Sequence, residues 1–378
     1  MSDLKDFINL RHTLHRYPEL YKQEHETSRR ISEFMRQFEP DEEIDVAGTG
    51  KIFIFKGNEP GDTILFRCEL DALPIQEDAP NLAYRSANDG VAHLCGHDGH
   101  MTIIAYLGKL ISEHKPKKGK VVLLFQPAEE TDLGAKDVVE SPEYHRLKPD
   151  YLFALHNLPG VKKNTVLVKE GSFTAASCGI TIKLKGRTSH AAEPEKGNNP
   201  YFTAQSIIQD VQSLVESEEK FNGKITTTLI YMRLGEISFG VSPSDLEMGL
   251  TLRAHENDDL DQLCQLTESI IKQHSDDAGL SFSFSYGEIY PATINNPDCV
   301  EMVKMASDSL NYEIIEMEEP NNWSEDFAYF TATKKGVQFG FGAGKDQSNL
   351  HDPAYNFPDD LIEPAGKLFF EIYKNRLL

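Results

Sequence analysis

The chain has 378 residues, of which 39% are hydrophobic and 26% are charged, and this composition excludes a mostly disordered chain. Sixty acidic residues against 38 basic ones give a formal net charge of -22. That charge argues against a nucleic-acid backbone or an anionic membrane surface as the main partner. The length predicts two domains, with three as the alternative.

The cysteines and the start of the chain bear on the cellular compartment. The cysteines are odd in number and widely spaced, at Cys68, Cys95, Cys178, Cys264 and Cys299, which favours reduced thiols over a disulfide framework. The first residues lack the basic start and apolar run of a signal peptide. No stretch approaches the roughly 20 apolar residues of a membrane-spanning helix. We therefore expect a soluble cytoplasmic protein that binds neither membrane nor nucleic acid.

The first part of the chain predicts alternating helices and buried strands. Apolar residues at helical spacing from Leu4 predict a helix that Pro18 ends, and a second helix is expected at residues 25–38. A further helix is expected at residues 100–113. Short apolar runs rich in β-branched or aromatic residues predict strands at residues 51–55, 63–66, 121–125 and 151–155. This order predicts an α/β domain with a mostly parallel sheet.

The pattern changes near Cys178. Alternation of apolar and polar residues predicts half-exposed strands, and helices are expected between them. In chain order these are a strand at 179–185, a helix at 200–216, strands at 225–233 and 245–254, a helix at 260–274 and a strand at 281–286. This β-α-β-β-α-β order predicts an inserted α+β, ferredoxin-like domain with an antiparallel sheet and helices on one face. We expect an α/β domain of residues 1–177 and 290–378, and an inserted domain of residues 178–289.

Residues 93–100 contain three histidines, one cysteine and one aspartate. Thiolate and imidazole are good ligands for zinc and similar divalent ions. Gly96 and Gly99 are expected to let the backbone bend so that neighbouring side chains converge. The density of ligand-type residues predicts a metal site; a polar loop with incidental histidines is the alternative.

Adjacent glutamates, Glu129 and Glu130, follow the apolar run at 121–125. One carboxylate can bind a metal while its neighbour moves a proton. A Glu-Glu pair by itself is more typical of a solvated helix start. The position of the pair after a predicted strand favours a functional role, because open α/β sheets bind ligands at the carboxyl ends of their strands.

Three other segments place polar residues where a strand is expected to end. Residues 66–74 contain Glu69 and Asp71, residues 151–157 end a buried run with His156, and His351 follows a glycine-rich run. Each of these residues alone can be structural. Together with the glutamate pair and the histidine cluster they predict one site at an edge of the sheet.

These segments together resemble the M20 family of metal-dependent peptidases and amidohydrolases. The most similar branch comprises the N-acyl-amino-acid amidohydrolases, which include hippurate, auxin-conjugate and N-acetyl-diaminopimelate hydrolases. The resemblance covers nearly the whole chain, in order and in spacing. It also includes residues 14–20, 188–194 and 324–327.

The resemblance implies a site for two divalent ions, with zinc, manganese, cobalt and nickel as candidates. Carried over by motif, the implied ligands are Cys95, His97, Glu130, His156 and His351. Cys95 matches the position expected to bridge the two ions. His97 and His156 are expected on one ion, and Glu130 and His351 on the other.

The resemblance also implies catalytic and substrate-binding roles. Glu129 matches the general base, and Asp71 matches the acid that orients a histidine ligand. In related dimers the residue matching His190 reaches the partner subunit's site and helps hold the oxyanion; the alternative is a surface-loop histidine. Arg253 matches an arginine for the substrate end, with a structural salt bridge as the alternative. A homodimer through the inserted domain is therefore expected.

The sequence departs from the family pattern at two positions, one near the proposed metal ligands and one where the substrate carboxylate is expected to bind. Glu69 stands where aspartate is usual, and Gly240 stands where an asparagine helps grip the substrate carboxylate. The implied activity is cleavage of the amide bond of N-acyl, often N-acetyl, amino acids by a metal-activated water, with Glu129 as base. The alternatives are a dipeptidase or carboxypeptidase of the same fold, a thiol hydrolase using Cys95, and a non-catalytic metal- or ligand-binding relative.

Overall fold

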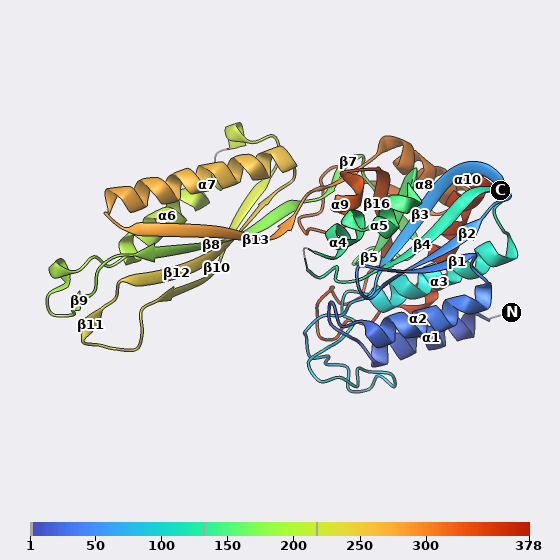
Figure 1. Ribbon diagram of the computed structural model, residues 1–378, viewed down its shortest axis with the longest axis horizontal. Coiled ribbons are helices and arrows are strands. Elements are labelled where there is room, and N and C mark those ends of the chain that lie inside the picture. The colour runs from blue at the N-terminus through green and yellow to red at the C-terminus, as the bar shows by residue number, and fades with distance from the viewer. Residues whose placement is uncertain (1–2, 132, 217) are drawn as a thin grey trace. The chain divides into compact units, whose positions relative to one another are not determined.

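The computed structural model describes residues 3–131, 133–216 and 218–378. The chain divides into two compact units (Figure 1). The first unit comprises Met1–Phe173, Thr293–Glu319 and Asp326–Leu378, and the second comprises Thr174–Ala292 and Pro320–Glu325.

The first unit is built around a mainly parallel sheet. Its strands are β1 (Glu42–Val46), β2 (Gly50–Lys56), β3 (Glu59–Glu69), β4 (Lys118–Gln126), β5 (Tyr151–Pro159), β6 (Thr165–Val168), β15 (Glu313–Glu316) and β16 (Lys335–Gly344). Over the described residues they form one eight-stranded sheet in the order β1-β2-β4-β3-β5-β16-β6-β15. The central strands β4, β3, β5 and β16 pair in parallel, while β1–β2, β2–β4 and β16–β6 are antiparallel. The four strands predicted from apolar runs are confirmed as β2 to β5.

Helices cover both faces of this sheet. One face packs against α1 (Leu4–Arg16), α2 (His25–Met35), α3 (His97–Glu113), α8 (Pro297–Ser309) and α10 (Ile362–Leu377). The other packs against α4 (Gly134–Glu140), α5 (Pro142–Leu147) and α9 (Ala328–Thr331). Along β2, Phe53 and Phe55 enter the first core, while Ile52 and Ile54 enter the second. Because strand side chains alternate between faces, a strand buried on both sides has a continuous apolar run.

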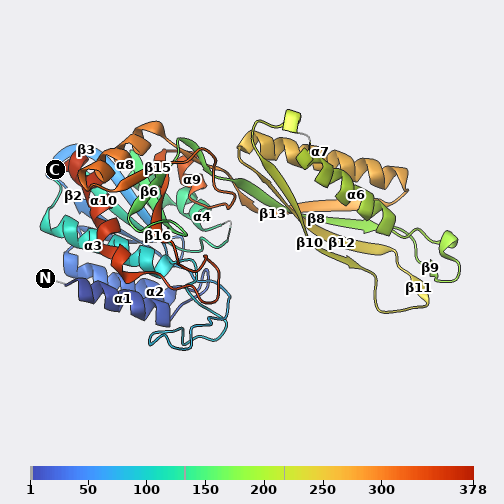
Figure 2. The same cartoon turned by 180° about the vertical axis from the view of Figure 1, so that it is seen from behind.

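The second unit has the predicted β-α-β-β-α-β order (Figure 2). Its elements are β8 (Ala176–Lys185), α6 (Tyr201–Ser213), β10 (Ile225–Leu234), β12 (Asp245–Ala254), α7 (Asn257–Asp277) and β13 (Ser281–Tyr290). The strands form an antiparallel sheet in the order β10-β12-β8-β13. Helices α6 and α7 share one apolar cluster with this sheet. The predicted antiparallel α+β fold is therefore confirmed.

Several short elements complete the fold. Within the part of the chain that the structure describes, two pairs of short strands lie outside the large sheets, namely β7 (Gly171–Thr174) with β14 (Thr293–Asn295), and β9 (Ser189–His190) with β11 (Val241–Ser242). The short 3-10 helices are η1 (Arg36–Phe38), η2 (Pro194–Lys196), η3 (Leu214–Glu216), η4 (Glu218–Lys220) and η5 (Asp359–Leu361). The helix predicted at 25–38 is thus α2 followed by η1, and the one at 200–216 is α6 followed by η3.

The cysteines of the chain are all free thiols. Among the residues that the structure describes, no helix has both the length and the apolar character needed to cross a bilayer.

Candidate metal centre

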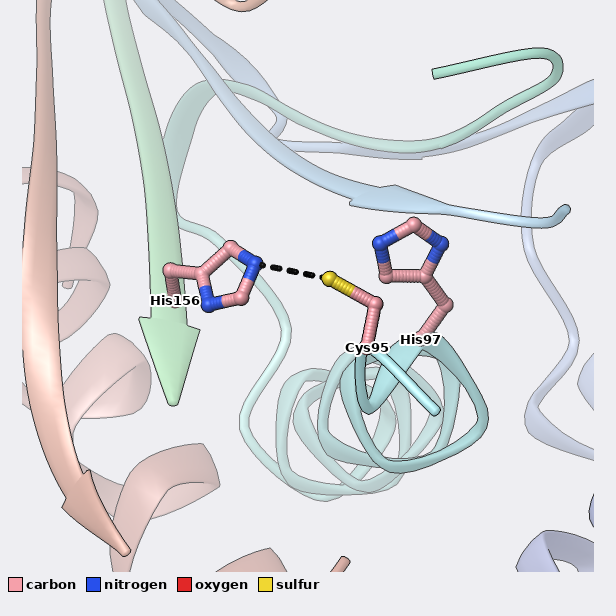
Figure 3. A group of neighbouring side chains, drawn as sticks. All are labelled: Cys95, His97 and His156. Atoms are coloured by element: carbon pink, nitrogen blue, oxygen red, sulfur yellow. Dashed lines mark hydrogen bonds between the residues drawn. The ribbon is translucent and has the colours of Figure 1, made fainter. Parts of the chain in front are cut away.

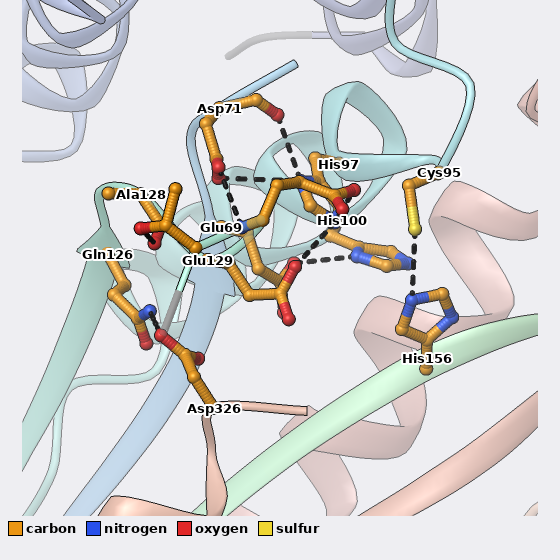
Figure 4. Close-up of polar contacts among 12 residues, drawn as sticks. Glu69, Asp71, Cys95, His97, His100, Gln126, Ala128, Glu129, His156 and Asp326 are labelled. Atoms are coloured by element: carbon orange, nitrogen blue, oxygen red, sulfur yellow. Dashed lines mark hydrogen bonds and ion pairs between the residues drawn. The ribbon is translucent and has the colours of Figure 1, made fainter. Parts of the chain in front are cut away.

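Polar groups from four parts of the first unit meet at the carboxyl ends of its parallel strands (Figure 4). Asp71 follows β3, Glu129 follows β4, and His156 lies within β5. His97 occupies the first turn of α3. This is the edge at which open α/β sheets bind ligands, as the strand-end pattern predicted.

Cys95 lies between two histidines (Figure 3). Its Sγ is 3.4 Å from Nε2 of His156. One ligand atom from each of Cys95, His97 and His156 lies within 4.8 Å of the other two, and all three residues are buried. Thiolate and imidazole at such spacing form a donor set suited to zinc and similar ions.

Cys95 also belongs to a second group, with Glu130 and His351. The ligand atoms of these three residues again lie within 4.8 Å of one another. Nε2 of His351 is 3.7 Å from Oε1 of Glu130. The structure therefore brings all five sequence-predicted ligands into two groups that share the Cys95 thiol.

The hydrogen bonds of His97 select its tautomer. Its Nδ1 lies 2.9 Å from the backbone carbonyl oxygen of Asp71, which can only accept, so Nδ1 carries the proton. Nε2 is then the atom with a free lone pair. It is buried and has no hydrogen-bond partner among the described residues, and it lies 3.7 Å from Glu129 and 3.9 Å from Glu130. A cation among these groups would satisfy Nε2, so the residues fit a bound metal.

His156 has the same arrangement. Its Nδ1 lies 3.0 Å from the carbonyl oxygen of Asn157, so Nδ1 is the donor and Nε2 is the nitrogen that faces Cys95. In a metal site such a bond fixes the ring orientation of a histidine ligand.

Asp71 holds two parts of the site together. Its backbone carbonyl orients His97, while its Oδ2 accepts a 2.9 Å hydrogen bond from the backbone N–H of Glu130. Its Oδ1 lies farther from Nδ1 of His97, at 3.7 Å. The aspartate therefore orients His97 mainly through its backbone and positions the glutamate segment through its carboxylate.

A buried ionic network adjoins these groups, because a carboxylate oxygen of Glu69 lies within 4.8 Å of ring nitrogens of His97 and His100. Arg67 pairs with Glu69 and, at 2.6 Å, with Asp326. Glu69 also lies 2.7 Å from Nδ1 of His100. Burial acts to raise the pKa of Glu69, but Arg67 and His100 outweigh it and hold that pKa well below its usual value. Glu69, noted from the sequence only as a departure from the family pattern, is thus an ionised member of this network.

No role was predicted from the sequence for Glu24, which accepts a hydrogen bond from the N–H of Ala128, or for His100 and Asp326 of this ionic network. The last two lie inside segments that the resemblance covers, so a search of those segments for further polar residues would have found them. Glu24 carries no such signal, because one acid at the start of an amphipathic helix is ordinarily a solvated residue.

The two glycines of the histidine cluster have different roles. Gly96 has a φ of 96°, and a Cβ there would lie 2.5 Å from Oδ1 of Asn157, so it permits the predicted bend. The bend predicted at Gly99 is wrong, because this residue continues α3. Gly99 instead provides space, since a Cβ there would lie 2.4 Å from the Phe357 ring.

The remaining candidates lie in the second unit. His190 is exposed in β9, opposite Val241 of β11, and its Nδ1 accepts a 3.0 Å hydrogen bond from the N–H of Ala192. Arg253 of β12 donates to the Ser324 hydroxyl at 2.8 Å. A Cβ added to Gly240 would have no atom within 4 Å.

Comparison with known proteins gives consistent matches. The sequence pattern of Peptidase family M20/M25/M40 matches residues 65–375. The chain is 27% identical to hippurate hydrolase of Campylobacter jejuni, over 97% of this chain and 95% of that protein. It is 30% identical to N-acetylcysteine deacetylase of Bacillus subtilis, with the same coverage of 97% and 95%. A solved Bacillus subtilis structure, described as a dinuclear metal-binding peptidase of the M20 family, matches with a TM-score of 0.84 and 28% identity, over 98% of this chain and 97% of that one.

Proposed function

The chain belongs to peptidase family M20/M25/M40, and we propose that it is a metal-dependent amidohydrolase that cleaves the amide bond of N-acyl amino acids. The observation that carries the proposal is the arrangement of Cys95 in two ligand groups, with Glu129 beside them. Relatives that match nearly the whole chain are a hippurate hydrolase and an N-acetylcysteine deacetylase, both of which act on N-acyl amino acids.

We propose that these five residues, with Cys95 common to both groups, would hold two divalent ions. The ligands of one would be His97 and His156, and those of the other Glu130 and His351; the two groups in the structure support this division. When bound, such ions lower the pKa of water and polarise the amide carbonyl.

Glu129 is the proposed general base. Its Oε2 lies 3.7 Å from Nε2 of His97, at the edge of the ligand groups, and it is buried. A carboxylate in this position can take a proton from the attacking water and return it to the leaving nitrogen. Asp71 supports both functions, since it orients His97 and holds the segment that carries Glu129 and Glu130.

The second unit is proposed to bind substrate and to form a homodimer. His190 and Arg253 are the proposed substrate contacts, on the basis of the family resemblance. Strand β10 supports the dimer, because it is an edge strand whose Ile230 side chain is 61% exposed. An apolar edge of this kind is a favourable surface for pairing with a second copy of the same strand. The free thiols support a cytoplasmic location.

Metal analysis paired with a substrate panel tests the function. The panel comprises N-acetyl amino acids, N-benzoylglycine and dipeptides with a free amino group. We expect close to two divalent ions per chain and chelator-sensitive release of the free amino acid from the N-acyl compounds. Preference for dipeptides would instead indicate a peptidase, and failure to bind metal even after reloading would contradict the proposed ligands.

A further inference from the structure

Glu24 is a fully buried carboxylate that has no place in the catalytic scheme above. Its residue exposure is 0%. It occupies the N-cap position of α2, yet its side chain makes no capping hydrogen bond to that helix. A buried acid needs hydrogen-bond partners, so its contacts indicate what it does.

The carboxylate joins two segments that are distant in sequence. Oε1 of Glu24 accepts a 2.9 Å hydrogen bond from the backbone N–H of Ala128. Oε2 accepts a 2.7 Å hydrogen bond from the Thr49 hydroxyl, in the turn between β1 and β2. Ser28 of α2 also donates to the carbonyl oxygen of Thr49. The carboxylate thus accepts one hydrogen bond from Thr49 and another from the residue immediately before Glu129.

Ala128 has an unfavourable backbone conformation. Its φ is 56°, in the left-handed region that residues with a Cβ rarely adopt. The surroundings are tight, because a Cβ on Gly134 would lie 2.5 Å from the Ala128 carbonyl oxygen. Such a conformation persists only where neighbouring groups stabilise it. The Glu24 carboxylate is one such group, because it accepts a charge-assisted hydrogen bond from the N–H of Ala128.

We propose that Glu24 is a positioning residue that directs the Glu129 carboxylate toward the ligand groups by holding Ala128 in its left-handed conformation. The turn is then fixed on both sides of Glu129, by Glu24 through the N–H of Ala128 and by Asp71 through the N–H of Glu130. This inference rests on the proposed role of Glu129 as the general base.

The central test compares Glu24→Ala with a matched control, Thr49→Val. Glu24→Ala removes both hydrogen bonds of the carboxylate, whereas Thr49→Val removes only the bond from Thr49 and leaves the N–H of Ala128 with its partner. Because small misplacements of a catalytic group cost up to about 100-fold in rate, Glu24→Ala should lower kcat by roughly 10- to 100-fold. KM and the metal content should stay at wild-type values. Thr49→Val should keep kcat close to wild type, and so should Glu24→Gln, which retains an acceptor oxygen.

A second-site variant tests the route through Ala128. Glycine adopts the left-handed conformation without steric cost. Ala128→Gly in the Glu24→Ala background should therefore recover part of the lost kcat. Hydrogen exchange of the segment at 127–131 should be faster in Glu24→Ala than in wild type, and this readout does not depend on activity.

The outcomes separate this inference from the proposed function. If wild type hydrolyses the panel and Glu129→Gln does not, an unchanged kcat in Glu24→Ala overturns the positioning role alone. Loss of metal in parallel with kcat, or an equal loss in Thr49→Val, would also overturn it, because both indicate general damage to the fold. If Glu129→Gln keeps its activity, Glu129 is not the base, and this inference fails with that assignment while the proposed hydrolysis stands; if wild type neither binds metal nor hydrolyses the panel, the proposed function itself fails.

Discussion

Nδ1 of His15 lies 3.0 Å from Oδ2 of Asp98, the residue that directly follows the proposed ligand His97. The other ring nitrogen lies 2.9 Å from Glu77, in the segment that joins β3 to α3. A neutral imidazole has only one N–H, so a ring that faces two carboxylates is protonated. Through Glu77 the imidazolium links α1 to the segment at 70–96, which carries Asp71 and Cys95, and through Asp98 it links α1 to α3.

The stability that His15 contributes should depend on pH. Burial acts to lower its pKa, but the hydrogen bonds with Asp98 and Glu77 raise it from 6.5 to about 9. Because the folded pKa is the higher one, the contribution is fully present below pH 6.5 and is lost as the pH rises through 9. A shift of this size corresponds to on the order of 3 kcal/mol. His15→Gln should therefore lower the free energy of unfolding most at pH 6 and least at pH 10.

Urea unfolding of wild type and His15→Gln, with a chelator present, measures this difference. The chelator removes any contribution from metal binding. A penalty that stays the same from pH 6 to pH 10 would show that His15 is not protonated in the folded state.

Removal of the Arg67 side chain should strongly destabilise the first unit. Arg67→Met leaves Glu69 and Asp326 buried without the guanidinium that they share. Breaking a buried pair in this way costs about 3–5 kcal/mol. The matched control is Arg146→Met, because Arg146 is 61% exposed in its pair with Glu42 and such pairs contribute about 0–1 kcal/mol. Equal unfolding midpoints for the two variants would contradict the prediction.

Two glycines of α3 should respond differently to alanine. In Gly99→Ala the new Cβ would lie 2.4 Å from the Phe357 ring, and overpacking of this kind costs about 1–3 kcal/mol. In Gly108→Ala the nearest atom is Cε of Met35, the end of a flexible side chain, at 2.6 Å. Met35 can move, and alanine improves helix propensity by about 1 kcal/mol, so this variant should be nearly neutral. Thermal unfolding of both variants checks the contrast.

Substitutions of the two adjacent glutamates should have different effects, one on catalysis and the other on metal binding. Glu129→Gln removes the proposed base and should lower kcat by about 100-fold or more, with the metal content unchanged. Glu130→Gln removes a proposed ligand and should lower the number of ions bound per chain. Metal analysis and initial rates on the same preparations distinguish these effects. Turnover at the wild-type rate in Glu129→Gln would exclude this residue as the base.

Gly240→Asn should strengthen substrate binding. The resemblance assigns carboxylate recognition to an asparagine at this position, and no atom lies within 4 Å of an added Cβ. A hydrogen bond to a charged group is expected to lower KM for N-acetyl amino acids by about tenfold. Gly287→Asn is the control, since a Cβ there also meets nothing within 4 Å. The prediction is wrong if both variants change KM equally, or if neither does.

The helices, the strands and the candidate ligands could be predicted from local sequence patterns. Secondary structure follows from apolar periodicity, which is local, so β2 to β5 and the β-α-β-β-α-β order of the second unit were predictable. The candidate ligands could be predicted because residues such as Glu129 and His156 stand at or just after a short apolar run, and this pattern spans only a few positions.

Which of these residues meet depends on how the separate elements pack. Cys95 directly precedes the N-cap of α3, and the packing of this helix on the sheet leaves its Sγ 3.4 Å from Nε2 of His156 in β5, across 61 positions of sequence. Glu24 meets Ala128 across 104 positions, and no local pattern marks that pairing. Nor does α3 show from its own residues that Gly99 must leave room for Phe357. Contacts of this kind depend on how separate elements pack, and packing is a property of the whole fold.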